Sequence, residues 1–253
     1  MAAQTKIPLQ ALDAMDFNEI LALRFADLEW RVPLPELYEN LIDQVVIECA
    51  TRSVGLDLKF FIAKEWLSPE ATTAVGLPFY LMHPKLTVIE HEFKSEAEGA
   101  SPESFLRLLR HEIGHCLDHA YGISRRRDFR ALFGSPLRHY DPDFYRPDYG
   151  SRDFVDHLPG HYAQAHPLED FAETFAVWLD PKSQWRTRYR RRPTVLRKLN
   201  YMERVVHEHA GLTHAAGAAL LGEAQRSHTT LGEHYKRQLR LLAKIRAHVT
   251  MNK

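Results

Sequence analysis

The sequence predicts an α+β protein, with its strands in the first half of the chain and its helices in the second. Segments typical of strands cluster before residue 100, and the chain after Pro102 has helical or irregular patterns. Strands and helices therefore do not alternate as they do in α/β proteins. The 253 residues are 45% hydrophobic, enough to bury a substantial core, which excludes a disordered or fibrous chain.

The first part of the chain predicts helices followed by a small sheet. Two helix-like stretches lie within residues 12–50, and a proline-containing break at residues 33–35 separates them. Residues 56–63 then predict a strand, because they are apolar and rich in aromatic and branched side chains. Residues 75–89 predict two further short strands around a turn at residues 83–85.

Residues 101–122 predict a helix with a defined start and end. Ser101 can cap its amino end, Pro102 suits its first turn and Gly122 suits its end. On a helical wheel one sector is apolar and contains Phe105, Leu106, Leu109, Ile113, Cys116, Leu117 and Ala120. We therefore expect this helix to pack on one side and to expose a polar strip along the margin of the core.

His111, Glu112 and His115 form an HExxH pattern on that strip. The spacing places both imidazoles on one face, one turn apart, where they can bind a single Zn²⁺. Glu112 is rotated away from the metal but can reach a water bound to it, which suits a general base. The alternative is a helix with surface histidines, and His119 on the same strip is either a rival ligand or a polar neighbour.

A zinc hydrolase needs a third protein ligand. A metzincin would have glycine and histidine where this chain has Asp118 and Tyr121, so that subclass is excluded. Residues 166–181 predict a second helix, with Glu169 and Glu173 together on one face. The two glutamates either face solvent or face a cation or an imidazole N–H, which would relieve their mutual repulsion.

The motifs HEIGHCLDHAYG at residues 111–122 and HYAQAHPLEDFAETFAVWLD at residues 161–180 give the chain a resemblance to a known family. It resembles gluzincin-type zinc metallopeptidases and, more narrowly, the family of putative zinc-binding metallopeptidases known mainly from bacterial genomes. The resemblance implies a zincin-like fold, with a small sheet packed on the HExxH helix and a mainly helical second half. It also implies Zn²⁺ as cofactor and a peptide or protein as substrate.

The resemblance further implies a role for each motif residue. His111 and His115 match the two ligands on the first helix, and Glu112 matches the general base. Glu169 matches the third ligand, on the second helix. Glu173 matches the acidic residue that orients a ligand histidine in many gluzincins.

Two further residues match positions seen in related enzymes. Tyr162 lies where some gluzincins place a tyrosine that faces the zinc, and its hydroxyl could donate to the oxyanion of the reaction. The alternative is an ordinary aromatic residue in a loop. Asp118 matches an acidic position, and we interpret it as a residue behind the ligands or at the end of the helix.

In zincin-like folds an edge strand beside the zinc receives the substrate in extended form. Residues 77–82 and 86–91 are the two candidates for this strand. Pro78 favours an edge position for the first of them, because proline has no N–H to donate to a neighbouring strand.

We expect one zincin-like unit over residues 1–253. Its expected parts are helices and a small sheet at 1–100, the HExxH helix at 101–122, a loop region bordering the active site at 123–165 and a helical half with the third ligand at 166–253. Within the loop region, residues 125–160 either border the cleft, as a lid would, or form an ordered surface insertion. Histidines of the C-terminal region are expected at the surface: His207, His209, His214, His228 and His234.

The 33 Lys and Arg residues balance the 33 Asp and Glu residues, which favours neither nucleic acid nor a membrane as partner. The run Arg186–Arg192 either binds phosphates or an acidic protein, or is a solvated connection, and the neutral total charge favours the connection. The chain has two cysteines, Cys49 and Cys116, and its first residues lack an apolar run of signal-peptide length. We therefore expect a cytoplasmic protein with reduced thiols, with export by a route that lacks a recognisable signal as the alternative; its oligomeric state is left open.

The main hypothesis is a zinc-dependent peptidase. One rival is a regulatory or DNA-associated binding protein with a structural or vestigial zinc site, whose fourth position a protein ligand such as His119 would close. The other rival is a zinc hydrolase that acts on a non-peptide amide or ester, since the same residues would serve that reaction.

Overall fold

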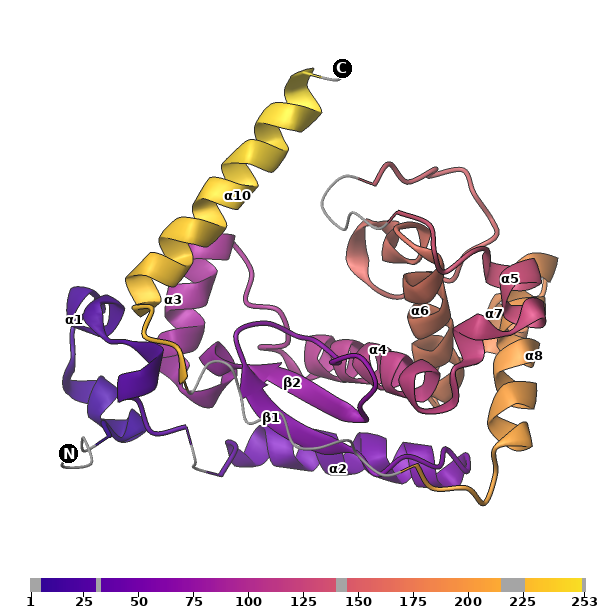
Figure 1. Ribbon diagram of the computed structural model, residues 1–253, viewed down its shortest axis with the longest axis horizontal. Helices are drawn as coiled ribbons and strands as arrows, with labels where there is room; N and C mark the ends of the chain where they lie inside the picture. Colours follow the sequence, from indigo (N-terminus) through magenta and orange to yellow (C-terminus); the bar gives the residue numbers. More distant parts are fainter. Residues whose placement is uncertain (1–5, 31–32, 140–144, 215–225, 252–253) are drawn as a thin grey trace.

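The computed structural model describes residues 6–30, 33–139, 145–214 and 226–251. The chain folds into many helices and a two-stranded parallel sheet, which agrees with mixed helix and strand content (Figure 1). In Figure 1 the sheet and α4 lie above α2, with α6 and α8 at one end of the molecule and α1, α3 and α10 at the other. The zincin-like packing of these elements stays a prediction.

The first helices begin where the sequence offers caps or prolines. They are η1 (Leu9–Ala14), α1 (Phe17–Ala22), η2 (Phe25–Asp27) and α2 (Glu36–Thr51). Asp16 and Glu19 cap the start of α1 with reciprocal hydrogen bonds to backbone N–H groups. Pro35 directly precedes α2, so the break predicted before the second helix is confirmed.

The sheet consists of β1 (Lys59–Ala63) and β2 (Ala74–Pro78), which run parallel with Lys59 opposite Ala74 and Ala63 opposite Pro78. The second strand predicted within residues 75–89 is wrong. Residues Phe79–Met82 form the 3-10 turn η3, and Pro84–Lys94 form helix α3. The candidate substrate strand at 86–91 is therefore wrong, and the strand in the candidate at 77–82 ends at Pro78.

The sequence of α3 contains signals for a helix as well as residues typical of a strand, and the second group caused the error. His83 caps the helix by accepting the N–H of Lys85 on its ring nitrogen, and Pro84 occupies the first turn. Leu86 and Ile89 are buried, whereas Val88 is exposed. Burial therefore follows the period of a helix, and the branched residues misled the prediction because their composition is typical of strands.

The outer edge of β2, away from β1, has its N–H groups engaged or missing. Gly76 donates its N–H to the carbonyl of Leu67 at 2.8 Å, in an isolated antiparallel bridge. Ala74 donates its N–H to the hydroxyl oxygen of Thr72 at 3.3 Å. Pro78 has no N–H, so along Ala74–Pro78 this edge has no N–H left to donate to an added strand.

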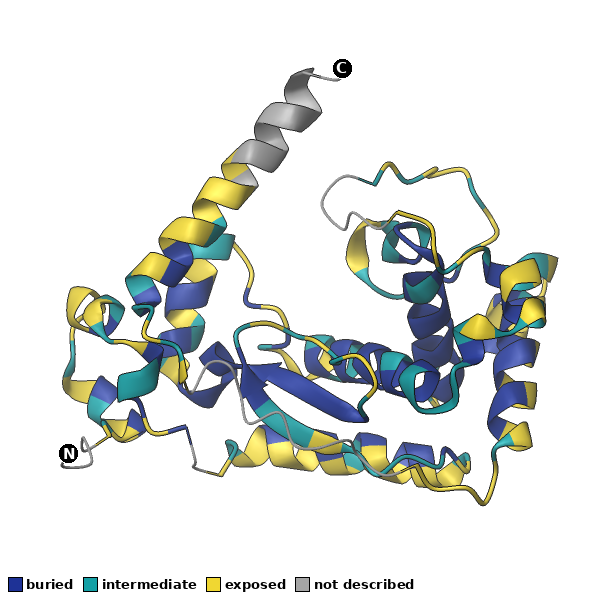
Figure 2. Cartoon of the chain, in the orientation of Figure 1, coloured by how far each residue is buried: buried dark blue, intermediate teal, exposed yellow. Residues whose placement is uncertain are grey.

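Helix α4 (Pro102–Tyr121) has the predicted bounds. The hydroxyl of Ser101 accepts the N–H of Ser104, and Gly122 ends the helix in the left-handed conformation with φ 60°. Helix α6 (Pro167–Leu179) is also confirmed, and its buried length is visible in Figure 2. The two helices approach closely at Gly114, where an added Cβ would lie 2.9 Å from the Cα of Ala172.

The region between α4 and α6 is less irregular than expected. It contains η4 (Ile123–Arg125), α5 (Arg127–Phe133) and η5 (Pro159–Gln164), so part of the predicted loop region 123–165 is helical. Phe129 and Phe133, four residues apart, are buried and pack against Phe171 of α6. This apolar pair stabilises α5, and the many charged residues around it hid the pattern.

The last elements are α7 (Trp185–Arg188), α8 (Pro193–Glu208) and α10 (Leu231–Met251), which projects from the body in Figure 1. The arginine run Arg186–Arg192 spans α7 and the turn before α8. Arg186 pairs with Glu203 at 2.7 Å and Arg192 pairs with Asp156 at 2.8 Å. The expected surface position of His234 is wrong, because this residue is buried.

Candidate metal centre

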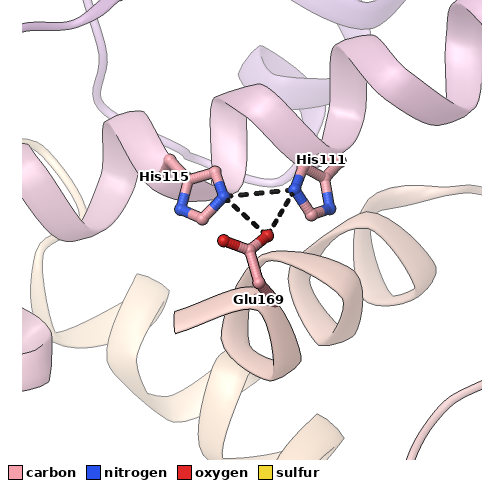
Figure 3. Close-up of side chains that lie close together, drawn as sticks. All are labelled: His111, His115 and Glu169. Carbon is pink, nitrogen blue, oxygen red and sulfur yellow. Dashed lines mark hydrogen bonds and ion pairs between the residues drawn. The ribbon is translucent and has the colours of Figure 1, made fainter. Parts of the chain in front are cut away.

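Three side chains from α4 and α6 meet at one point, as Figure 3 shows. The Nε2 atoms of His111 and His115 lie 3.1 Å apart. The Oε2 atom of Glu169 lies 3.0 Å from the first and 3.3 Å from the second. We call these three atoms the donor triad.

The size of the donor triad fits a tetrahedral metal ion. Zinc binds imidazole nitrogen and carboxylate oxygen at about 2.0–2.2 Å, and two ligands of a tetrahedron are then about 3.3–3.6 Å apart. The observed separations of 3.0–3.3 Å lie at or slightly below this range. The two histidine nitrogens also face each other, so both lone pairs are available to a cation only when neither nitrogen carries a proton.

Glu173 contacts the ring of His111 at Nδ1, the ring nitrogen that is not part of the donor triad. Its Oε1 accepts a hydrogen bond from Nδ1 of His111 at 2.9 Å, and its Oε2 accepts the backbone N–H of Leu158 at 2.8 Å. Both oxygens of this fully buried carboxylate are thus engaged. With Nδ1 as the donor, Nε2 of His111 is left to offer its lone pair to a metal ion.

The charges of the site favour a cation between the helices. Burial by itself lowers the pKa of His111, but hydrogen bonds with Glu169 and Glu173 outweigh burial and raise that pKa well above its usual value. Burial by itself raises the pKa of Glu169, but hydrogen bonds with His111 and His115 outweigh it and lower that pKa. The carboxylates therefore stabilise positive charge at the donor triad. A protonated histidine supplies such a charge, and a divalent metal ion would supply it as well.

Glu112 is buried on α4, next to His111 in sequence. Burial raises the pKa of its carboxyl group, and the nearby His111 and His115 oppose this effect only in part. A carboxylate in such a place has a higher affinity for a proton than an exposed glutamate. This property suits a group that accepts and later releases a proton.

Tyr162 also lies at the site. It belongs to η5, and the centroid of its ring is 5.8 Å from that of the His111 ring. The structure thus places the predicted tyrosine beside His111 of the donor triad, while its function as a hydrogen-bond donor stays a prediction.

Asp118 and His119 occupy the last turns of α4. A side-chain oxygen of Asp118 accepts the N–H of Ser124 at 2.6 Å, which fixes the turn after the helix. The rings of His119 and His115 are stacked, with their centroids 6.4 Å apart. Among the described residues, one group of at least three His, Cys, Asp or Glu side chains has its ligand atoms within 4.8 Å of one another, and it does not include His119.

Sequence reasoning missed the residues that fix α4 in place. Arg110 donates two hydrogen bonds to Glu48 of α2, both at 2.8 Å, and this ion pair is buried. Gly114 permits the close approach of α6. The sequence signal for Gly114 was its place inside HEIGH, but nothing in the sequence pointed to Glu48 as the partner of Arg110.

The comparison with protein families decides the classification. A model of the family described as "putative zinc-binding metallo-peptidase" matches residues 102–237, more than half of the chain. The chain belongs to this family. The metallo-peptidase match begins at the first residue of α4 and includes all of α6, so it covers the donor triad.

Two further findings concern the other comparisons and the helices of the described residues. No curated protein and no solved structure matches the chain. In the described part of this metallo-peptidase family member, no helix combines the length and the apolar character that crossing a bilayer requires.

Proposed function

We propose that the protein is a zinc-dependent peptidase of the gluzincin type, acting as one unit over residues 1–253. The observation that carries the proposal is the donor triad of His111, His115 and Glu169, with the buried Glu112 beside it. Two histidines and a glutamate are a common set of protein ligands in catalytic zinc sites, and they leave a fourth position open. The description of the family, which names a metallo-peptidase, also supports this proposal.

When bound, Zn²⁺ would polarise the scissile carbonyl and lower the pKa of a water molecule. Glu112 accepts the proton of the attacking water and passes it to the leaving amine. Tyr162 donates a hydrogen bond to the carbonyl oxygen as that oxygen gains negative charge. Glu173 keeps the His111 ring in an orientation that leaves its Nε2 free to bind the ion that His111, His115 and Glu169 would hold.

Two rival functions differ from this proposal in the fourth ligand or in the substrate. A structural site would close its fourth position with a protein ligand such as His119, and the grouping of three donors without His119 favours an open position. A hydrolase of non-peptide amides or esters would use the same residues. Profiling with peptide libraries and ester substrates separates it from a peptidase.

The test combines metal analysis with one substitution. The purified protein is expected to hold about one zinc ion per chain. Glu112→Gln should retain this zinc and lose about 10²–10⁴-fold in kcat, because an amide of the same shape does not accept a proton.

The matched control is Glu103→Gln, since Glu103 is an exposed glutamate on the same helix and should leave peptide hydrolysis unchanged. Elemental analysis and a peptide cleavage assay give the two readouts. Full activity of Glu112→Gln would refute the general base, and a chain that takes up no zinc on reconstitution would refute the site.

A further inference from the structure

Two consecutive residues before Tyr162 have left-handed backbone conformations. Gly160 has φ 71° and ψ 11°, and His161 has φ 56° and ψ 44°. Glycine adopts this conformation freely, whereas histidine does so rarely. Such strained residues persist where neighbouring groups hold them in place, and they gather at active sites.

A neighbouring segment holds this turn on both sides. The hydroxyl of Tyr145 donates a hydrogen bond to the carbonyl of Gly160 at 2.7 Å. On the far side of the turn, the side-chain amide of Gln164 accepts the N–H of Asp148 at 2.8 Å and donates to its carbonyl at 3.0 Å. Tyr162 thus lies between two anchored positions, Gly160 and Gln164.

Tyr145 also contacts the side chain of Tyr162, the residue that directly follows the turn. The ring of Tyr145 meets that of Tyr162 edge to face, with centroids 6.2 Å apart. The Tyr162 ring also lies near the ring of His111, with centroids 5.8 Å apart. Tyr145 therefore restrains both the backbone before Tyr162 and the position of its ring.

We propose that Tyr145 is a positioning residue, which holds the strained turn at Gly160 and His161 so that Tyr162 faces the metal ligands. This inference rests on the proposed function, because it assigns Tyr145 an effect on catalysis through Tyr162. The contacts that carry this inference are those of Tyr145 with the Gly160 carbonyl and with the Tyr162 ring. The hydroxyl of Tyr145 acts through the backbone carbonyl of Gly160.

The kinetic test uses zinc-loaded full-length protein. Tyr145→Phe keeps the ring and removes the hydrogen bond, and kcat should fall about 10-fold to 100-fold through misplacement of Tyr162. KM and zinc content should stay unchanged. In the background of Tyr162→Phe, the same substitution should cause no further loss of kcat, because the residue it positions no longer has a hydroxyl.

Tyr121→Phe is the matched control. The hydroxyl of Tyr121 also donates to a glycine carbonyl, that of Gly55 at 2.6 Å, but at the carboxyl end of α4. A general loss of stability would affect both variants, whereas a positioning effect lowers kcat only in Tyr145→Phe. Unchanged kcat in Tyr145→Phe, or equal losses with and without the Tyr162 hydroxyl, would overturn the proposal.

A second readout does not depend on peptide hydrolysis. In protein labelled with fluorotyrosine and loaded with Co²⁺, the fluorine signal of Tyr162 is the one that Tyr162→Phe removes. The paramagnetic ion should broaden it strongly in the unsubstituted protein and clearly less in Tyr145→Phe. Gly160→Ala should have the same effect, because its Cβ would lie 3.0 Å from the Tyr145 hydroxyl and its φ is positive.

The two readouts separate the two proposals. A protein that cleaves no peptide but shows the expected cobalt effects refutes the peptidase function and retains the positioning role. Equal broadening in the unsubstituted protein, Tyr145→Phe and Gly160→Ala overturns the positioning role.

Discussion

At the scale of single residues, Glu169 and Glu173 show how one helix face can supply two different functions. They lie one turn apart on α6 and contact opposite nitrogens of the same ring. Glu169 approaches Nε2 of His111 at 3.0 Å, and Glu173 approaches Nδ1 at 2.9 Å. Of the two glutamates, Glu169 also approaches His115, at 3.3 Å, so its carboxylate is the one placed to bind a metal ion together with both histidines.

We therefore expect Glu169→Ala to weaken zinc binding much more than Glu173→Ala. Loss of a residue that orients a ligand typically changes metal affinity by about 10–100-fold, and loss of a ligand usually costs more. Glu173→Ala should leave a partly active enzyme. Titration of both variants against a zinc chelator measures the ranking, and the reverse order would transfer the ligand role to Glu173.

Gly114 supports a second prediction at this scale. At an ordinary helix position, Gly→Ala stabilises by about 1 kcal/mol. Here the added Cβ would lie 2.9 Å from the Cα of Ala172 and 3.1 Å from its carbonyl oxygen. Gly114→Ala should instead destabilise by about 1–3 kcal/mol, because α6 has to move away from α4.

The same movement would separate Glu169 from the histidines, so zinc affinity should fall together with stability. Urea unfolding and chelator competition give both quantities. A stabilised variant with normal zinc affinity would show that the crossing of α4 and α6 tolerates the methyl group.

The sequence was informative at this scale where chemistry and periodicity coincide. Ligands four residues apart on one helix can be predicted because the helix fixes their geometry. The Leu158 N–H that Glu173 accepts could not be predicted, since it comes from an irregular segment whose path depends on tertiary packing. For the same reason, the hydrogen bond between Tyr145 and Gly160 had no signal in the sequence.

At the scale of elements, a buried ion pair connects α4 to α2. Arg110 forms two hydrogen bonds with Glu48 of α2, and Asp180, just after α6, lies 3.8 Å from the same guanidinium group. Because Arg110 directly precedes His111, this contact also fixes the rotation of α4 about its axis.

Arg110→Met should destabilise the protein by about 3–5 kcal/mol, because Glu48 would remain buried without its partner. The double variant Arg110→Met, Glu48→Leu should regain most of that loss, since no unpaired charge remains. Arg107→Met is the control: its partner Glu103 is exposed, and the expected cost is below about 1 kcal/mol. Urea unfolding of the four proteins decides whether the ion pair acts as described.

Elements with local start and stop signals were predictable, and those without were not. Ser101 and Gly122 marked the bounds of α4, and Pro167 marked the start of α6, which the His166 ring also caps in the structure. In α3 the capping signals at His83 and Pro84 were present but competed with a run of residues that favour strands. Helix α5 is short, and its burial depends on contact with α6, which the sequence does not reveal.

At the scale of the whole molecule, α10 joins the two ends of the described chain. His234 is buried among aromatic rings, with centroids 5.5 Å from Phe25 and 5.6 Å from Phe79. Burial, helped by the nearby charges of Lys94, Lys64 and Arg237, lowers the pKa of His234 to about 4. The contact between α10 and the first segments of the chain therefore requires a neutral histidine.

Acid should weaken this contact. An unfolded histidine has a pKa of about 6.5 and takes up a proton more readily than the buried His234. The full stability is therefore present above about pH 6.5 and is lost progressively as the pH falls through about 4, by about 3 kcal/mol in total.

His234→Phe should reduce this pH dependence in metal-free protein, whereas substitution of the exposed His228 by Gln should leave it unchanged. Urea unfolding at pH 7.5 and 5 tests the difference. The same slope in His234→Phe and in the unsubstituted protein would show that His234 is not the group responsible.

The outer edge of β2 has a consequence for the way a peptide could bind. Because Ala74 and Gly76 already donate their N–H groups and Pro78 has none, a chain laid along this edge receives no main-chain N–H from Ala74–Pro78. Ligands would have to be selected by their side chains and by the polarity of the surrounding surface. The same arrangement protects the molecule itself, because an edge without free N–H groups gives a second copy little to pair with and so disfavours sheet-like aggregation.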